Sequence, residues 1–203
     1  AGQVSLGMRR LSIIDLEHGW QPFTSEDGQR VLIANGEIYN HRSLRDDLIQ
    51  RGHRFATQSD CEVILHLYEE QGEACVQSLR GMFAFALWDA QKHKLLLARD
   101  RMGQKPFFYR LSPTRGDAAP ARHPRGVTLR RRGAFEFASE IKAFSDLEFT
   151  TNELFELFEF CFNEHTLYRG ILSLRPGHYL IYDLERGTCR THAYWDIEQQ
   201  IGE

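Results

Sequence analysis

The stretch MFAFALWDAQKHKLLLARD, residues 82–100, constrains the fold of this 203-residue chain more than any other feature. Two apolar runs enclose a short polar segment, which predicts two strands joined by a turn. Further strands are expected at residues 11–16, 31–34, 107–111, 135–139, 178–184 and 189–195. Because strands outnumber helices and several are hairpin-like, we expect an α+β protein with largely antiparallel sheets.

Two stretches are apolar at helical spacing. One carries Leu44, Leu48 and Ile49 on a single face and is expected to end at Gly52. The other is TNELFELFEFCF, residues 151–162.

A third helix is expected after residues 59–62, which fit a capping box with Ser59 at the N-cap and Glu62 at N3. This helix is expected to stop near Gly72. The residues on its apolar side are Val63, Ile64, Leu67 and Tyr68.

The composition argues against several classes of protein. Lys and Arg number 25 and Asp and Glu 28, and the resulting net charge of −3 argues against a general nucleic-acid binder. The cysteines show no CxxC or Cys/His ligand spacing, which disfavours a disulfide framework or a zinc site and fits thiols in a reducing cytosol. No stretch resembles a signal peptide or is apolar for long enough to span a membrane. We therefore expect a cytoplasmic protein with no metal and no nucleic-acid or membrane partner.

Residues 112–133 differ from the rest of the chain. They hold three of the six prolines and six arginines, against a single acidic residue, Asp117. This composition predicts a solvated surface loop inserted between two strands. A basic patch that binds RNA is the alternative, but interleaved aromatic residues are missing from the stretch.

Seven stretches, taken together and in order, are similar to one family. They are RRLSIIDL, NGEIYNHRSLRDDL, SDCEVILHLYEEQG, LRGMFAFALWD, ARDRMGQKPFFY, FASEIKA and TLYRGILSLRPGHYL. They resemble the glutaminase domain of glutamine-hydrolysing asparagine synthases, a class II glutamine amidotransferase. The resemblance implies an N-terminal-nucleophile (Ntn) hydrolase fold with four αββα layers and two stacked, largely antiparallel sheets. It implies such a domain at residues 1–196, with an insertion at 112–133, and the start of a linker to a synthetase domain at 197–203.

The stretch VLIANGEIYN, residues 31–40, has two interpretations. Asn-Gly between apolar runs is a strong hairpin signal, because both central residues of a type I′ turn need positive φ. The resemblance implies instead a strand that runs into the active site and is followed by a helix, and we favour this interpretation. Asn35 and Gly36 then match the oxyanion hole, where a side-chain amide N–H and a backbone N–H point at the developing oxyanion. Glycine permits a close approach of the backbone to the substrate.

The resemblance also implies residues that bind glutamine. Arg10 matches the arginine that binds the α-carboxylate, for which its guanidinium fork is suited. Glu37 and Asp60 match positions near the α-ammonium group. From the residues alone, Arg10 could lie on the surface, Asp60 could be a helix cap and Glu37 a solvated strand-end residue. Met82 lies in a segment similar to one that faces the domain interface, which implies a place on the ammonia path, and a plain core methionine is the alternative.

The family's nucleophile is a cysteine at the mature N-terminus, whose own α-amino group serves as the base. This chain begins Ala1-Gly2-Gln3, so we expect it to lack the nucleophile and the first strands and to be inactive as a glutaminase. Cys61 is expected to be a small buried apolar residue rather than a substitute. No phosphate-binding loop is found, so no cofactor is expected here, and ATP, Mg²⁺ and the aspartate site are assigned to the absent synthetase domain. The alternative is a non-catalytic relative that binds or regulates.

Overall fold

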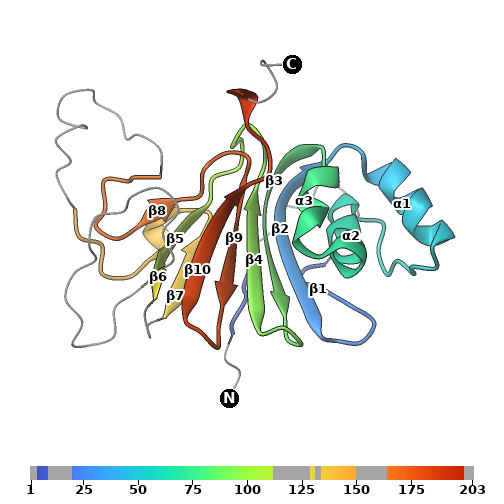
Figure 1. The fold of residues 1–203 in the computed structure, drawn as a ribbon, viewed down its shortest axis with the longest axis horizontal. Coiled ribbons are helices and arrows are strands. Elements are labelled where there is room, and N and C mark those ends of the chain that lie inside the picture. Colours follow the sequence, from blue (N-terminus) through green and yellow to red (C-terminus); the bar gives the residue numbers. More distant parts are fainter. Residues whose placement is uncertain (1–3, 9–19, 112–128, 131–133, 150–163, 199–203) are drawn as a thin grey trace.

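The computed structural model describes residues 4–8, 20–111, 129–130, 134–149 and 164–198. In these residues two antiparallel sheets form the body of the molecule, with the helices gathered beside β2 and β3 (Figure 1). The larger sheet has the strand order β1-β2-β3-β4-β9-β10-β6, and the smaller sheet the order β7-β5-β8. The strands of the larger sheet are β1 Phe23–Thr24, β2 Arg30–Ile38, β3 Gly81–Asp89, β4 Lys94–Arg99, β9 His178–Asp183, β10 Thr188–Ala193 and β6 Leu129–Arg130. The strands of the smaller sheet are β7 Phe135–Ala138, β5 Phe108–Leu111 and β8 Leu172–Ser173.

The described helices are short. They are α1 His41–Gln50, α2 Val63–Gln71 and α3 Cys75–Ser78, with 3₁₀ turns η1 Asp60–Glu62, η2 Gly72–Ala74 and η3 Ile141–Ala143. None of these helices is both long and apolar enough to cross a bilayer.

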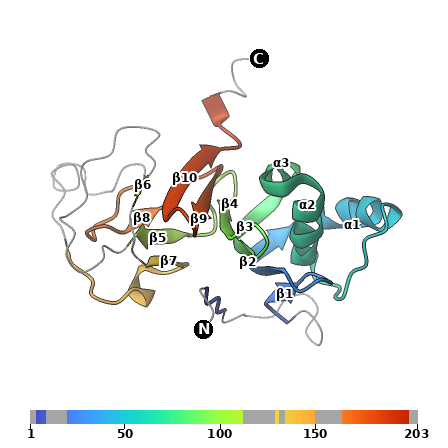
Figure 2. The ribbon, with the colours of Figure 1, turned by 60° about the horizontal axis from the view of Figure 1, so that its bottom comes forward.

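Strand alternation divides the core into two halves. Successive side chains of a strand point to opposite faces of its sheet. Leu32 of β2 and Phe83 of β3 pack with the helices, whereas Ile33 and Ala84, one residue along on each strand, face the smaller sheet. Figure 2 shows the helices beside β2 and β3 and away from β5, β7 and β8. The larger sheet therefore separates a helical layer from a second sheet.

Helix α2 is the core of the helical layer. Its residues Val63–Tyr68 are all buried, because α1, α3 and β2 surround it. Each fully buried aliphatic side chain contributes about 1.5–3 kcal/mol to stability. The helix ends at Gly72, which has a φ of +60°, as the sequence predicts.

Most predicted strands are confirmed. The two strands expected in 82–100 correspond to β3 and β4, and the stretches expected at 31–34, 107–111, 135–139, 178–184 and 189–195 overlap with β2, β5, β7, β9 and β10. The predictions at 11–16 and 151–162 concern residues outside the described part of the chain, and so does most of the 112–133 stretch. Within that stretch Leu129–Arg130 pair with β10, so these two residues form a strand and not a loop.

The hairpin interpretation of Asn35-Gly36 is wrong, and the continuing strand is confirmed. Strand β2 runs without a break through both residues, with Asn35 opposite Ala84 and Gly36 opposite Phe83. Helix α1 follows it, as the resemblance implies. The local turn preference of Asn-Gly is overridden because nine consecutive residues pair with β3.

Two helix details are also corrected. Ser59 makes no side-chain cap bond, and the Glu62 carboxylate instead accepts hydrogen bonds from the backbone N–H groups of Ala56 and Thr57, at 2.7 and 2.8 Å. The predicted capping box is therefore absent, because Glu62 binds the segment upstream of the turn. On α1, Ile49 is 52% exposed, so that helix buries a narrower face than its apolar residues suggest.

Candidate active site

A cavity of about 690 Å³ opens on the face of β2 and β3 that points away from the helices. Five of the six residues that the sequence assigned to catalysis, substrate binding or ammonia passage line it: Asn35, Gly36, Glu37, Asp60 and Met82. Arg10 lies outside the described residues, although Gly7 and Met8, shortly before it, line the cavity. Segments far apart in the sequence thus converge on one hollow.

Strand alternation explains why side chains of β2 reach the cavity. Ile33, Asn35 and Glu37 share one face of the strand, and all three line the cavity. The antiparallel register places Asn35 opposite Ala84 and Glu37 opposite Met82. A carboxamide, a carboxylate and a thioether are therefore presented on the same face of two paired strands.

The outer edge of β2 forms part of the cavity wall. The N–H of Ala34 donates to Oε1 of Gln21 at 2.7 Å, and its C=O accepts from Nε2 of the same side chain at 2.8 Å. Four residues further along β2, the backbone N–H of Ile38 donates to Oδ2 of Asp60 at 2.7 Å. Gly36 lies between these two bonded positions on the same edge.

The backbone N–H of Gly36 points along this edge and away from β3. Phe83, which lies opposite Gly36 on β3, makes its backbone hydrogen bonds on the side away from β2. Its N–H donates to the Asp100 carboxylate, and its C=O accepts from the Asp100 N–H. The C=O of Gly36 accepts instead from the Cys61 thiol at 3.7 Å. In an antiparallel strand the N–H and C=O of one residue point to the same side, so the Gly36 N–H is expected on the side away from β3.

Glycine is required at position 36 by the neighbouring strand. Its φ is +148°, and a Cβ there would lie 2.0 Å from the Met82 carbonyl oxygen. Gly81 on β3 is in the same situation, with a φ of +153° and a Cβ position 2.1 Å from the Glu37 carbonyl oxygen. Any side chain at either glycine would separate β2 from β3 at the cavity wall. The sequence suggested a different reason for glycine, the approach of the backbone to a substrate.

The charge of the described lining suits a cationic group. Glu37, Asp60 and Glu140 are its acidic residues, and Lys105 is its one basic residue. Asp60 is only 4% exposed, so its carboxylate acts in a medium of low dielectric constant, where its interaction with an ammonium group is stronger.

Sequence reasoning missed two contributors, Gln21 and Lys105. Lys105 lies in a loop whose backbone is held by Asp100, and the Lys105 N–H donates to Oδ2 of that buried carboxylate at 3.0 Å. The stretch ARDRMGQKPFFY was recognised as a motif, and it is the signal that could have identified Lys105. Gln21 lies outside the recognised stretches, and its side-chain amide binds the backbone of Ala34 in the cavity wall.

The described cysteines are buried thiols, as expected for Cys61. Cys61 lines the cavity, and its sulfur points at the Gly36 carbonyl. Burial raises the pKa of Cys75 to about 12, and this residue does not line the cavity. A thiol with such a raised pKa is a poor nucleophile near neutral pH.

Two antiparallel sheets, with a helical layer on the larger one, form an Ntn-hydrolase type of fold, and comparisons with known proteins agree. Residues 1–195 match the family model described as "Glutamine amidotransferase domain", and the chain belongs to that family. It is 38% identical over 208 residues to asparagine synthetase [glutamine-hydrolyzing] 2 of Bacillus subtilis, covering 97% of this chain and 25% of that protein. It is 37% identical to a probable asparagine synthetase [glutamine-hydrolyzing] of Schizosaccharomyces pombe, covering 96% of this chain and 28% of that protein.

The fold resembles that of a solved glutamine phosphoribosylpyrophosphate amidotransferase from B. subtilis. The TM-score is 0.55 at 22% identity, over 86% of this chain and 32% of that one. This likeness identifies the fold as that of the Ntn-hydrolase amidotransferases. The chain spans little more than a quarter of the length of the curated relatives described above and corresponds to their N-terminal glutaminase domain.

Proposed function

We propose that the cavity binds glutamine and that its side-chain amide is hydrolysed there to glutamate and ammonia. The observation that carries this proposal is the convergence of Asn35, Gly36, Glu37 and Asp60 on one hollow of about 690 Å³. A hollow of this size holds a free amino acid with room for closure around it.

In this proposal Asn35 and Gly36 stabilise the oxyanion that forms when the glutamine amide is attacked. The Asn35 carboxamide and the Gly36 N–H would supply the two donors. The direction of the Gly36 N–H, away from β3, supports its role. Asp60 and Glu37 would hold the α-ammonium group, and Arg10 the α-carboxylate.

The nucleophile is proposed to be a cysteine that enters the cavity from outside the described residues. Cys61 has its sulfur on the Gly36 carbonyl, and Cys75 lies away from the cavity with a raised pKa. A cysteine next to a terminal amine is activated without a further side chain, because the amine serves as the base.

We further propose that the ammonia passes to an ATP-activated aspartate in a synthetase domain of the same polypeptide, in the cytoplasm. Support comes from the relatives, which are named glutamine-hydrolysing asparagine synthetases and are much longer than this chain.

Met82 lines the cavity and is proposed to lie on the ammonia path. If so, Met82→Glu in the full-length polypeptide uncouples glutamine hydrolysis from amide synthesis, and unchanged coupling would remove Met82 from the path.

The test is glutamine hydrolysis by the full-length polypeptide that carries this chain. Asn35→Ala should mainly lower kcat, by about 10²–10³-fold, because an oxyanion donor acts in the transition state. Arg10→Ala should mainly raise KM, because the carboxylate contact is the same in the ground and transition states. Arg190→Ala, at an exposed position of β10, is the matched control and should change neither constant. Equal kcat for Asn35→Ala and the parent enzyme would contradict the assignment of the oxyanion hole.

A further inference from the structure

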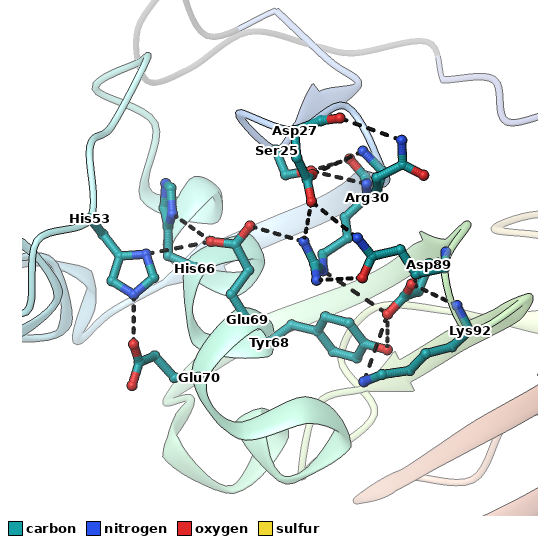
Figure 3. Close-up of polar contacts among 12 residues, drawn as sticks. Ser25, Asp27, Arg30, His53, His66, Tyr68, Glu69, Glu70, Asp89 and Lys92 are labelled. Carbon is teal, nitrogen blue, oxygen red and sulfur yellow. Dashed lines mark hydrogen bonds and ion pairs between the residues drawn. The ribbon is translucent and has the colours of Figure 1, made fainter.

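Two histidines and three glutamates gather on the helical side of the molecule, away from the cavity lining. Figure 3 shows four of them, His53, His66, Glu69 and Glu70. His66, Glu69, Glu70 and Glu62 come from α2 and the turn before it, whereas His53 comes from the segment that follows α1. One potential metal-binding atom from each of His53, His66 and Glu69 lies within 4.8 Å of the other two. Nothing in the proposed glutaminase chemistry uses these groups.

The distance of Glu69 from each histidine is the one expected between two ligands of a tetrahedral metal. Oε2 of Glu69 lies 3.4 Å from Nδ1 of His53 and 3.3 Å from Nδ1 of His66. Tetrahedral Zn²⁺ bonds to nitrogen and oxygen of about 2.0–2.1 Å place two ligand atoms about 3.3–3.4 Å apart. The two spacings from Glu69 therefore match those of zinc ligands, and the candidate ligand atoms of the two histidines lie within 4.8 Å of each other.

The far nitrogen of each imidazole faces a further carboxylate. Nε2 of His53 lies 2.9 Å from Oε1 of Glu70. Nε2 of His66 is buried without a hydrogen bond in the described structure, and its nearest ion-pair partner is Oε1 of Glu62, at 3.6 Å. Metal-bound histidines characteristically place the other ring nitrogen against a carboxylate, which fixes the tautomer and raises the basicity of the ligand.

The surroundings leave one side of the cluster accessible. The His66 side chain is only 5% exposed, and its ring packs on Phe55 with centroids 4.3 Å apart. Glu69 keeps 22% of its side-chain surface exposed, which gives an ion and a water ligand a route in. Arg30 lies 3.6 Å from Oε1 of Glu69 and leaves Oε2 for the metal. The Arg30 charge is shared with two other carboxylates, those of Asp27 and Asp89.

We propose that Nδ1 of His53, Nδ1 of His66 and Oε2 of Glu69 bind a divalent zinc ion, with water as the fourth ligand. Glu70 and Glu62 would orient the two imidazoles. The ion would join α2 to the segment that leads into the turn carrying Asp60, so its role is to stabilise that part of the fold. A His₂Glu set with an open position matches the donors that zinc prefers in proteins.

The test uses the whole chain, stripped of metal with a chelator and titrated with Zn²⁺ by calorimetry and with Co²⁺ by visible absorption. We expect one equivalent to bind, an intense tetrahedral Co²⁺ spectrum, and a rise in Tm on zinc addition. His53→Gln, at the more exposed of the two histidines, should weaken binding at least tenfold and abolish the Co²⁺ spectrum. Glu70→Gln should keep the stoichiometry and weaken binding by about 10–100-fold.

The matched control is His93→Gln. His93 is also paired with a glutamate, since its Nδ1 lies 2.8 Å from Oε1 of Glu185, but it is exposed and far from α2 in the sequence. This variant should bind zinc as the parent chain does. The proposal would be overturned if the folded chain took up neither ion, or if His53→Gln and the parent bound zinc equally. The cluster would then be a network of His–Glu contacts without a metal.

Discussion

The carboxylate of Asp60 accepts a hydrogen bond from the backbone N–H of Ile38 at 2.7 Å. This bond joins the last residue of β2 to the turn before α2, and both partners are buried. Asp60 therefore has a structural task in the fold besides any contact with a substrate. The two tasks use different properties of the side chain, because the Ile38 N–H needs an acceptor oxygen and an ammonium group needs a negative charge.

Asp60→Ala and Asp60→Asn should separate these tasks. Alanine leaves a buried N–H without an acceptor, which costs about 1–3 kcal/mol, so the free energy of unfolding should fall by that amount. Asparagine keeps an acceptor oxygen and should retain most of the stability, yet its loss of charge should raise KM for glutamine in the full-length polypeptide. Urea unfolding of the chain and steady-state kinetics measure the two effects. An unchanged KM for Asp60→Asn would contradict the proposed ammonium contact.

Gly36→Ala should destabilise the chain strongly. The added Cβ would lie 2.0 Å from the Met82 carbonyl oxygen and 2.6 Å from the Phe83 Cα, so the two strands must move apart. We expect a loss of about 3 kcal/mol or more, in the range of severe packing errors.

The control for Gly36→Ala is Gly28→Ala. Gly28 also has positive φ, +68°, but a Cβ there meets nothing within 4 Å. It should cost only the conformational penalty, about 1–2 kcal/mol. Thermal unfolding of both variants gives the comparison. Equal losses of stability would mean that the close contact between β2 and β3 is not what requires glycine at position 36.

The sequence was sufficient to predict most of the longer strands of the larger sheet, because alternation and apolar runs are local properties. Strands β3, β4, β9 and β10 are each marked by their own residues, and α2 is marked by its buried side chains. Local rules gave the wrong structure for Asn35-Gly36, because the pairing of these residues with Phe83 and Ala84 across the sheet cannot be predicted from the stretch itself. The resemblance to a family supplied what local rules lacked.

The remaining errors have the same cause. Glu62 was assigned to a capping box by its spacing from Ser59, but its oxygens are bound to Ala56 and Thr57, which the course of the chain brings beside it. Gln21 was missed because it acts through an edge of β2 that only the folded sheet exposes. The His53 and His66 pair shows no ligand spacing in the sequence, since the two residues come from different elements.

Stability should depend on the ionisation of Glu62. Burial tends to raise the pKa of this carboxyl, but the nearby His66 ring, the Thr57 hydroxyl and two backbone N–H groups together lower it below the ordinary value of 4.5. A lowered pKa in the folded state stabilises the protein above pH 4.5, and this contribution is lost as the pH falls through the folded value. The Glu62→Gln variant cannot titrate at this position. The stability difference between the parent and Glu62→Gln should therefore be largest near neutral pH and shrink below pH 4.5.

Unfolding by urea at several pH values, with a chelator present to remove any bound metal, measures this dependence. Glu185→Gln is the control, because Glu185 is a glutamate that is 72% exposed and contacts a histidine at the surface. It should show no comparable change with pH. A difference between the parent and Glu62→Gln that stays constant down to about pH 3 would rule out ionisation of Glu62 as its cause.

Asp100 organises the loop that carries Lys105 to the cavity. It is completely buried, and its two oxygens accept four backbone hydrogen bonds. Oδ1 accepts from the N–H groups of Met102 and Gln104 at 3.1 and 3.0 Å, and Oδ2 from those of Phe83 and Lys105 at 3.2 and 3.0 Å. An ionised carboxylate suits this place because it accepts at both oxygens and donates at neither.

Asp100→Asn should therefore be costly although it changes almost no volume. One oxygen becomes an NH₂ group that faces two backbone N–H donors, so both lose their acceptor inside the protein. At about 1–3 kcal/mol for each of the two unsatisfied groups, the free energy of unfolding should fall by about 2–6 kcal/mol. Asp196→Asn makes the same chemical change where the carboxylate accepts a bond from the Glu198 N–H at an exposed position, and it should stay within about 0.5 kcal/mol of the parent. Urea midpoints at constant m-value measure both variants. A loss below 1 kcal/mol for Asp100→Asn would mean that the loop reorganises around the amide, and that Asp100 does not fix the position of Lys105.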